Sequence, residues 1–217
     1  MHLQSKARII LNPYFHSVFL LWVSLAGSIL AISTRIDIFK FINSHNTEAT
    51  DRLFFLITYM GQPEVIIPTL IALMLLPQFR HKWYFFTGVA CNISPLIIQQ
   101  VLKKLFHHDR PFRMFSQDHD WIHFASYWTK LVGNNSFPSG HSQGAFSFFC
   151  FLSLLLPARY RMFGLLFGIF AVAVCYSRVY LAAHFFDDVF FGSIVGAVTT
   201  TLLFSLMNKY HPVTAEL

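Results

Sequence analysis

Three short polar stretches stand out in a chain that is otherwise strongly apolar. They are residues 103–111 (KKLFHHDRP), 137–142 (FPSGHS) and 177–188 (SRVYLAAHFFDD). Together they supply cations, imidazoles and carboxylates, which are the groups that bind an anion and transfer protons beside it. Charged side chains are costly near a membrane, so their presence predicts one shared functional site.

The cations of these stretches have the chemistry of a phosphate-binding site. Lys103, Arg110 and Arg178 supply three positive charges. Arginine forks bind phosphate oxygens in pairs, whereas a lysine ammonium acts as a point charge. Three such groups in one place neutralise an anion that carries several oxygens.

The middle stretch adds hydrogen-bond donors. Its PSG turn leads into a predicted helix over residues 141–156, and the free N–H groups at a helix N-terminus form an anion site. Gly140 lets the backbone come close to a ligand because it has no Cβ. The hydroxyl of Ser139 is a further donor.

The last stretch places an imidazole and a carboxylate four residues apart. If the predicted helix over residues 188–207 begins one turn earlier, His184 and Asp188 share one helical face. The carboxylate can then accept the hydrogen of one ring nitrogen and fix the tautomer, which leaves the other nitrogen free to react.

Composition predicts a single membrane-embedded unit over residues 1–217, with its motif-bearing core at 103–188. Of the 217 residues, 55% are hydrophobic and only 12% are charged, whereas soluble domains carry about 25% charged residues. The net charge is +6, but the basic residues form no stripe along the sequence, which argues against nucleic acid as a partner. The three cysteines lack the spacing of a disulfide framework or a zinc site, and we expect them to be buried.

Hydropathy predicts an all-α bundle of six membrane-spanning helices, since a span needs ~20 mainly apolar residues. An amphipathic segment at 46–62, capped by Asn46 or Thr47, either lies along the interface or extends the second span. The six predicted spans cover residues 14–32, 64–76, 83–106, 141–156, 162–181 and 188–207.

The distribution of basic residues predicts the orientation of the bundle. The two termini and the connectors at 77–83 and 157–162 fall on one side, with seven basic residues and one acid. Basic residues favour the cytoplasmic side, so we expect the three polar stretches to face the periplasm or the exterior. We therefore expect any chemistry of these stretches to take place at the extracytoplasmic end of the bundle.

The three stretches, taken in order, resemble the type 2 phosphatidic acid phosphatase family. These integral-membrane lipid phosphatases share a fold with the vanadium haloperoxidases, and their pattern is K-x6-R-P, then P-S-G-H, then S-R-x5-H-x3-D. The positions here that match this pattern are Lys103, Arg110, Pro111, Pro138, Ser139, Gly140, His141, Ser177, Arg178, His184 and Asp188.

The resemblance implies a role for each matched polar residue. His184, oriented by Asp188, is expected to attack phosphorus and form a phosphohistidine. His141 is expected to protonate the leaving group and then to activate water. The phosphate-binding residues it implies are Lys103, Arg110, Ser139, Gly140 and Arg178. The family mechanism needs no metal and no cofactor.

The expected substrate is a membrane lipid phosphate or pyrophosphate whose tail stays in the bilayer. Undecaprenyl pyrophosphate is the first choice, followed by lipid A phosphate and phosphatidylglycerol phosphate, in a bacterial inner membrane and with no obligatory protein partner. Two alternatives are a haloperoxidase-like enzyme that uses vanadate and a non-catalytic protein that binds or transports lipid phosphates. The first is disfavoured by the membrane spans, and the second by the presence of both histidines.

Several polar neighbours of the matched residues are expected to be solvated. We expect Asp187 to be a helix-start or solvated acid. We expect Lys104 to be only a neighbour of the site, because the spacing of the pattern selects Lys103. We expect a solvated loop at His107, His108 and Asp109. The alternative is that these residues contact a lipid head group. The stretch at 118–123 (DHDWIH) has spacing that suits a metal, but a surface loop is the favoured interpretation.

Overall fold

The computed structural model describes residues 9–115, 121–125 and 135–210, and every regular element in these ranges is helical. The all-α prediction is therefore confirmed for the described chain. The α-helices are α1 (Pro13–Ile32), α2 (Arg35–Ser44), α3 (Glu48–Tyr59), α4 (Pro63–Leu75), α5 (Lys82–Leu105), α6 (Pro111–Met114), α7 (Gly140–Leu154), α8 (Phe163–Tyr180) and α9 (Phe186–Tyr210).

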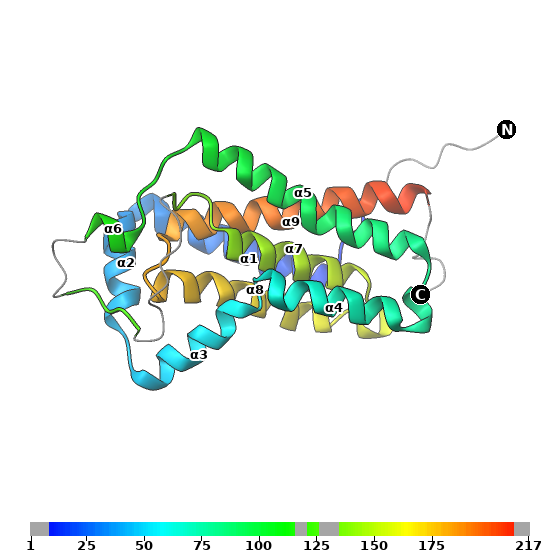
Figure 1. Cartoon of the computed structure of the whole chain (residues 1–217), viewed down its shortest axis with the longest axis horizontal. Helices are drawn as coiled ribbons and strands as arrows, with labels where there is room; N and C mark the ends of the chain where they lie inside the picture. Colours follow the sequence, from blue (N-terminus) through cyan, green and yellow to red (C-terminus); the bar gives the residue numbers. More distant parts are fainter. Residues whose placement is uncertain (1–8, 116–120, 126–134, 211–217) are drawn as a thin grey trace.

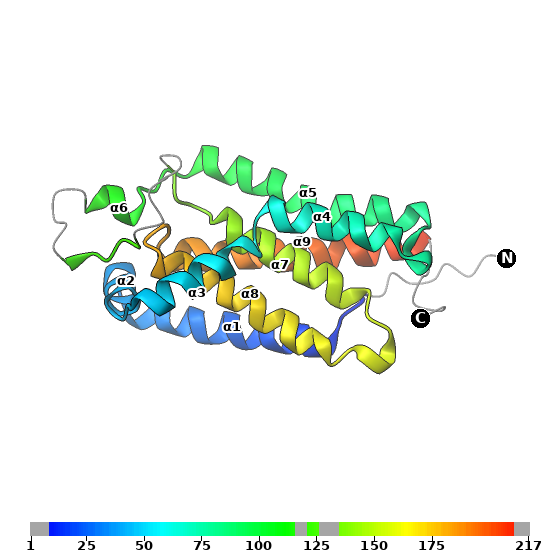
Figure 2. The same ribbon diagram turned by 60° about the horizontal axis from the view of Figure 1, so that its bottom comes forward.

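The long helices form a bundle around α7 (Figures 1 and 2). Helices α1, α5, α8 and α9 run along its length, and the short helices α2 and α6 lie at one end. Most of α7 is buried, although its sequence is no more apolar than that of its neighbours. The same end of the bundle collects the C-termini of α5 and α8 and the N-termini of α7 and α9 (Figure 1).

The six predicted spans correspond to six helical regions, with ends that shift by three residues or fewer. Four helices, α1, α5, α8 and α9, are long and apolar enough to cross a membrane, and the bent pair of α3 and α4 adds a possible fifth. Helix α7 has only 15 residues and lies inside the bundle, so it is not among the helices long enough to cross a membrane.

The predicted amphipathic segment forms α3, which joins α4 at a sharp bend. Thr47 caps it through a reciprocal pair of hydrogen bonds with Thr50, as the sequence suggested for this position. Helices α3 and α4 meet at an angle of 51°, and Pro63 opens α4 at a position where a missing N–H costs little. The break brings Gly61 and Gln62 against α7.

Close backbone contact fixes that break in place. A Cβ added to Gly144 would lie 2.6 Å from the carbonyl oxygen of Gly61, closer than real side chains approach. Only glycine allows the two chains to pack at this distance. The break between α3 and α4 is thus held next to the first turn of α7, which carries His141.

The outer surface of the bundle is apolar. Leu20 on α1, Ile71 on α4 and Leu202 on α9 are each more than half exposed, and large exposed apolar surfaces mark contact with lipid or protein. The three cysteines are buried and unpaired, as their placement in apolar runs predicted. Together with the apolar helices, this surface makes the chain an integral membrane protein.

Candidate active site

The three polar stretches meet at one end of the bundle. The backbone N–H of Ser139 donates to the carbonyl of Asp188 over 3.0 Å, and Arg110 Nη1 donates to the carbonyl of Ala183 over 2.9 Å. Each of these bonds joins two stretches that are distant in the sequence. Lys103 is near enough to Arg110 and Asp188 to sense both charges. One shared site, as the sequence predicted, is what the structure contains.

A tight turn after α8 positions His184. The N–H groups of Ala182 and Ala183 donate to the carbonyls of Val179 and Arg178, and Ala182 has a φ of 54°. This is the Schellman arrangement, in which a left-handed residue ends a helix and reverses the chain. Helix α9 begins only at Phe186, so His184 lies on the turn and not on the helical face that the sequence suggested.

His184 nevertheless reaches Asp188, because the turn folds it over the first turn of α9. Its Nδ1 lies 3.5 Å from Asp188 Oδ2 and 3.1 Å from Ser136 Oγ. Its Nε2 lies 3.3 Å from Arg110 Nη1, which can only donate. These contacts select the tautomer with hydrogen on Nδ1 and a lone pair on Nε2.

Burial keeps the His184 ring uncharged. The residue is only 2% exposed, and burial, opposed by the hydrogen bond to Asp188, lowers the pKa of His184 to about 3. The ring is therefore neutral at physiological pH, with Nε2 available as a nucleophile.

Ser136 and Asn135 are two site residues that the sequence analysis missed. Ser136 donates to Asp188 Oδ2, and its oxygen is left to accept from His184 Nδ1. The Asn135 side chain accepts from the N–H groups of His108 and Phe137 and so ties two stretches together. Their only sequence signal is that they directly precede FPSGHS.

A residue of α3 holds the side chain of Arg178 in place. It is 2% exposed, and its Nη1 donates to Thr58 Oγ1 over 2.8 Å. A buried cation of this kind marks a functional position near a membrane. Thr58 had no signal in the sequence, because its partner is 120 positions away.

The start of α7 has the capped geometry expected of an anion site. Ser139 is the N-cap, and its hydroxyl accepts from the N–H and the hydroxyl of Ser142. A Cβ at Gly140 would lie 3.0 Å from Gln99 Nε2, so the close neighbour of this glycine is the Gln99 side chain. Gln99 also donates to the carbonyl of Pro138, which positions the turn.

His141 lies on the first turn of α7 and within electrostatic range of Lys103, Arg110, Arg178 and His184. Its Nε2 is 2.8 Å from the side-chain amide of Gln62, at the break between α3 and α4. The amide can donate to a neutral ring or, after a flip, accept from a protonated one. Gln62 can therefore hold His141 in both proton states.

A cavity of about 360 Å³ opens beside His141 between α4, α5 and α7. It is lined partly by Gln62, Gln99 and Gln100, and further along by apolar side chains. Ile66, Ile67, Asn92 and Ile93 also line a second, more apolar cavity of about 480 Å³ between α4 and α5. The two cavities form one groove from the His141 end toward the middle of the bundle.

Two neighbours expected to be solvated are instead partly buried beside Asp188. Asp187 lies in the first turn of α9, as predicted, with Oδ2 3.8 Å from Arg35 Nη1 and a side chain only 19% exposed. His108 has its Nδ1 3.6 Å from Asp188 Oδ1, and the Asp188 carboxylate raises the pKa of His108. His108 is a loop residue, as expected, but its side chain is only 31% exposed, whereas His107 and Asp109 are exposed.

The DHDWIH stretch is described only from Trp121 onward. Its last residue, His123, bonds both oxygens of Asp51 through Nε2, at 2.9 and 2.8 Å. Tyr180 donates to the same carboxylate over 2.6 Å. His123 therefore anchors this segment to α3 and α8. The first three residues of the stretch, 118–120, lie outside the described residues.

The fold and the site together define an integral membrane protein with a His–Asp pair and three cations at one end of a helical bundle. The family model of the PAP2 superfamily matches residues 82–212. The chain belongs to that superfamily, as the three motifs predicted.

Individual relatives agree with this assignment. A protein of Escherichia coli (strain K12) named as the putative undecaprenyl-diphosphatase YbjG is 30% identical over 112 residues, which are 51% of this chain and 50% of that protein. The chain thus aligns with only half the length of that relative. The undecaprenyl-diphosphatase of Sulfolobus acidocaldarius is 26% identical over 199 residues, 86% of this chain and 88% of its own.

Two crystal structures share the fold. LpxE of Aquifex aeolicus has a TM-score of 0.65 and 22% identity, over 80% of this chain and 96% of its own. A PAP2-type phosphatidylglycerolphosphate phosphatase from Bacillus subtilis has a TM-score of 0.64 and 23% identity, over 89% and 95%. At these identities the likeness establishes the architecture.

Proposed function

We propose that the protein is a lipid phosphatase that removes phosphate from a membrane lipid phosphate or pyrophosphate, using His184 as its nucleophile. The observation that carries the proposal is the set of contacts made by the two ring nitrogens of His184. Ser136 and Asp188 accept at Nδ1, and Arg110 donates toward Nε2. The imidazole is neutral and oriented, and Arg110 can change partner from Nε2 to a phosphate oxygen. This arrangement suits attack by Nε2 on phosphorus.

The reaction proceeds in two displacements. Lys103, Arg110 and Arg178 neutralise the phosphate oxygens, and the Nε2 lone pair attacks phosphorus while the bond to the leaving oxygen breaks. His141 gives that oxygen a proton. The enzyme then carries a phosphohistidine, and Asp188 stabilises the positive charge of its ring.

The second displacement releases inorganic phosphate. His141, now neutral, takes a proton from water, and the resulting hydroxide attacks phosphorus. The P–N bond breaks and its electron pair returns to Nε2, which restores the resting enzyme. His141 ends the cycle protonated, which is the state that the first displacement requires, and no step requires a metal or another cofactor.

The groove between α4 and α5 supports a lipid substrate that enters from the side. Its walls are mostly apolar and lead from His141 toward the middle of the bundle. A long hydrocarbon tail can lie there while its phosphate reaches the polar end, because an apolar protein wall is as favourable for it as the surrounding lipid. We assign this end to the extracytoplasmic face of a bacterial inner membrane.

Undecaprenyl pyrophosphate is the first choice of substrate, with lipid A phosphate and phosphatidylglycerol phosphate next. The two undecaprenyl-diphosphatases among the relatives favour this order. The compact chain, which we regard as a single catalytic domain, suits a substrate that is itself embedded in the bilayer.

The test is phosphate release by the purified protein in detergent with these three lipids and phosphatidic acid. Wild type should hydrolyse at least one of them, and His184→Ala should lose at least a thousandfold in kcat while it still binds the lipid. The matched control is His107→Ala, an exposed histidine in the same end of the protein. Equal rates for wild type and His184→Ala would refute the proposed nucleophile, and bromide oxidation by vanadate-loaded protein would favour a haloperoxidase.

A further inference from the structure

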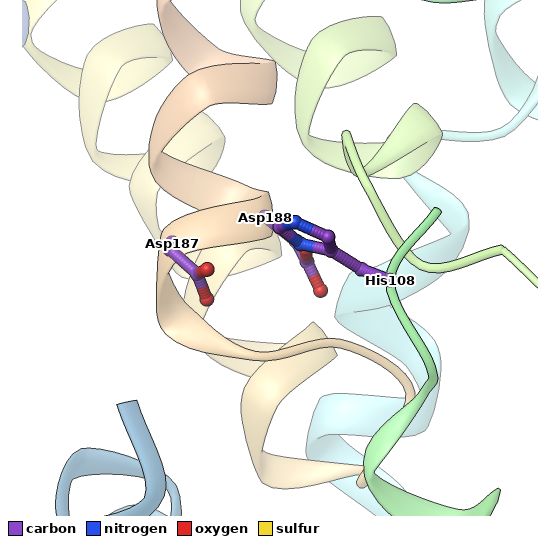
Figure 3. A group of neighbouring side chains, drawn as sticks. All are labelled: His108, Asp187 and Asp188. Carbon is purple, nitrogen blue, oxygen red and sulfur yellow. The ribbon is translucent and has the colours of Figure 1, made fainter. Parts of the chain in front are cut away.

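A second group of titratable side chains lies on the far side of Asp188 from His184. Figure 3 shows the ring of His108, from the loop after α5, against the first turn of α9, where Asp187 and Asp188 project. One ligand atom from each of the three residues can be chosen so that all lie within 4.8 Å of one another. The proposed reaction uses only Asp188 of the three.

The atoms that face each other in this cluster lack hydrogen bonds. His108 Nδ1, Asp187 Oδ1 and Asp188 Oδ1 are all buried and have no hydrogen-bond partner within the described ranges. His108 Nδ1 and Asp188 Oδ1 are 3.6 Å apart, which is too long for a hydrogen bond. Buried polar atoms are nearly always satisfied, so three exceptions within one cluster favour a site that takes up a ligand.

Each carboxylate divides its two oxygens between different tasks. Asp188 is fully buried, and its Oδ2 accepts from Ser136 and from the N–H of Phe185. Its Oδ1 is thus left for the cluster. Asp187 behaves likewise, because Oδ2 faces Arg35 and Oδ1 has no hydrogen bond within the described residues.

We propose that His108, Asp187 and Asp188 form a binding site for a divalent transition-metal ion of the zinc class, which inhibits the enzyme reversibly. One imidazole nitrogen and two carboxylate oxygens are a ligand set that zinc accepts, with a fourth position left for water. Magnesium and calcium prefer oxygen ligands alone. The three atoms need only a modest approach, which the loop that carries His108 can supply.

The surrounding charges predict a weak site and not a permanent one. Arg35 lies 3.8 Å from Asp187 and offsets part of its charge, and Arg110 and Lys103 are close enough to Asp188 to offset part of its charge. A bound cation would draw electron density from Asp188 and weaken its support of the charged ring in the phosphohistidine. Inhibition by this route rests on the proposed function, whereas metal binding itself does not.

Binding is tested on the full-length protein in detergent after treatment with EDTA and buffer exchange. Zinc chloride is titrated by calorimetry, and melting temperature is measured with and without zinc. Wild type should bind one zinc ion and gain stability from it, and His108→Asn/Asp187→Asn should bind at least tenfold more weakly. The matched control His107→Asn/Asp109→Asn alters exposed neighbours in the same loop and should bind as wild type.

Activity gives an independent readout. Zinc should slow phosphate release by wild type at least tenfold, EDTA should restore it, and His108→Asn/Asp187→Asn should keep its rate in zinc. If His108 serves only as a cation for the two carboxylates, this variant melts lower but shows no difference in zinc affinity, which overturns the proposal. Equal affinity for calcium and zinc also overturns it. Zinc binding by an inactive wild type would refute the proposed function and leave the metal site standing.

Discussion

Ser136 bridges the His–Asp pair: its Oγ lies 3.1 Å from Nδ1 of His184 and donates to Oδ2 of Asp188. The direct distance between the pair is longer, at 3.5 Å. The serine therefore carries part of the contact that fixes the tautomer of the ring. A hydroxyl in this place makes the orientation of the proposed nucleophile depend on both Ser136 and Asp188.

Ser136→Ala should lower kcat about tenfold to a hundredfold, since a hydrogen bond to a charged group contributes about 1.5–3 kcal/mol. KM should change little, because the serine supports the ring and does not face the lipid. Steady-state phosphate release measures both constants. Ser136→Thr, which keeps the hydroxyl, is the control, and an alanine variant with wild-type kcat would contradict the bridge.

Gln62→Ala should lower kcat about tenfold by freeing His141, whose proton transfers contribute about 10²–10⁴-fold in comparable enzymes. The side-chain amide of Gln62 is 2.8 Å from His141 Nε2, so the two side chains are in direct contact. Gln62→Glu should favour protonated His141 and shift the pH profile of kcat to higher pH. Gln100→Ala, which lines the same cavity, is the comparison, and an unchanged profile for Gln62→Glu would argue against the role of Gln62.

Ala182→Gly should raise the free energy of unfolding by up to ~1 kcal/mol. A left-handed residue other than glycine costs roughly 1–2 kcal/mol, and glycine gives back about half of this through its larger unfolded-state entropy. The φ of 54° at Ala182 makes this turn the place to test it. Thermal melting in detergent measures the change, and Ala182→Val should melt lower; a lower melting temperature for the glycine variant would show that the turn is not strained.

Stability should fall in mild acid because His184 stays neutral in the folded protein. Burial lowers its pKa to about 3, whereas the unfolded chain takes up a proton on this ring below about pH 6.5. Above pH 6.5 the free energy of unfolding is therefore unaffected by this ring. Between pH 6.5 and 3 it falls progressively as the pH is lowered, by about 2 kcal/mol at pH 5. Melting curves at pH 7.5 and 5 should show a larger drop for wild type than for His184→Gln; parallel drops would mean that the ring is charged in the fold.

Ile93→Trp should raise KM for a long-chain lipid about tenfold and leave short, soluble phosphates unaffected. Ile93 lines both cavities of the groove, and overfilling a packed apolar site costs about 1–3 kcal/mol. Ile97→Trp changes an exposed residue on the same helix and serves as the control. Equal KM values for both variants would place the tail elsewhere.

The sequence alone determined the class of fold and most of the polar site. Apolar runs of about 20 residues leave a chain few options but helices in a membrane, so α1, α5, α8 and α9 were predictable to within a few residues. The spacing from Lys103 to Arg110, through Ser139 and on to His184, likewise indicated a phosphate site, because cations and imidazoles have few other reasons to persist there.

The tertiary structure alone decided how those groups meet. The turn at Ala182 places His184 above α9, whereas periodicity suggested a shared helical face. Ser136, Thr58 and Gln62 belong to the site through partners 48 to 120 positions away, and no local pattern records such a contact. His108 and Asp187 have ordinary loop and helix-start sequences, and only packing around Asp188 brings their unpaired atoms into one cluster. Local sequence fixes which helices form, but burial and long-range hydrogen bonds fix which side chains share a site.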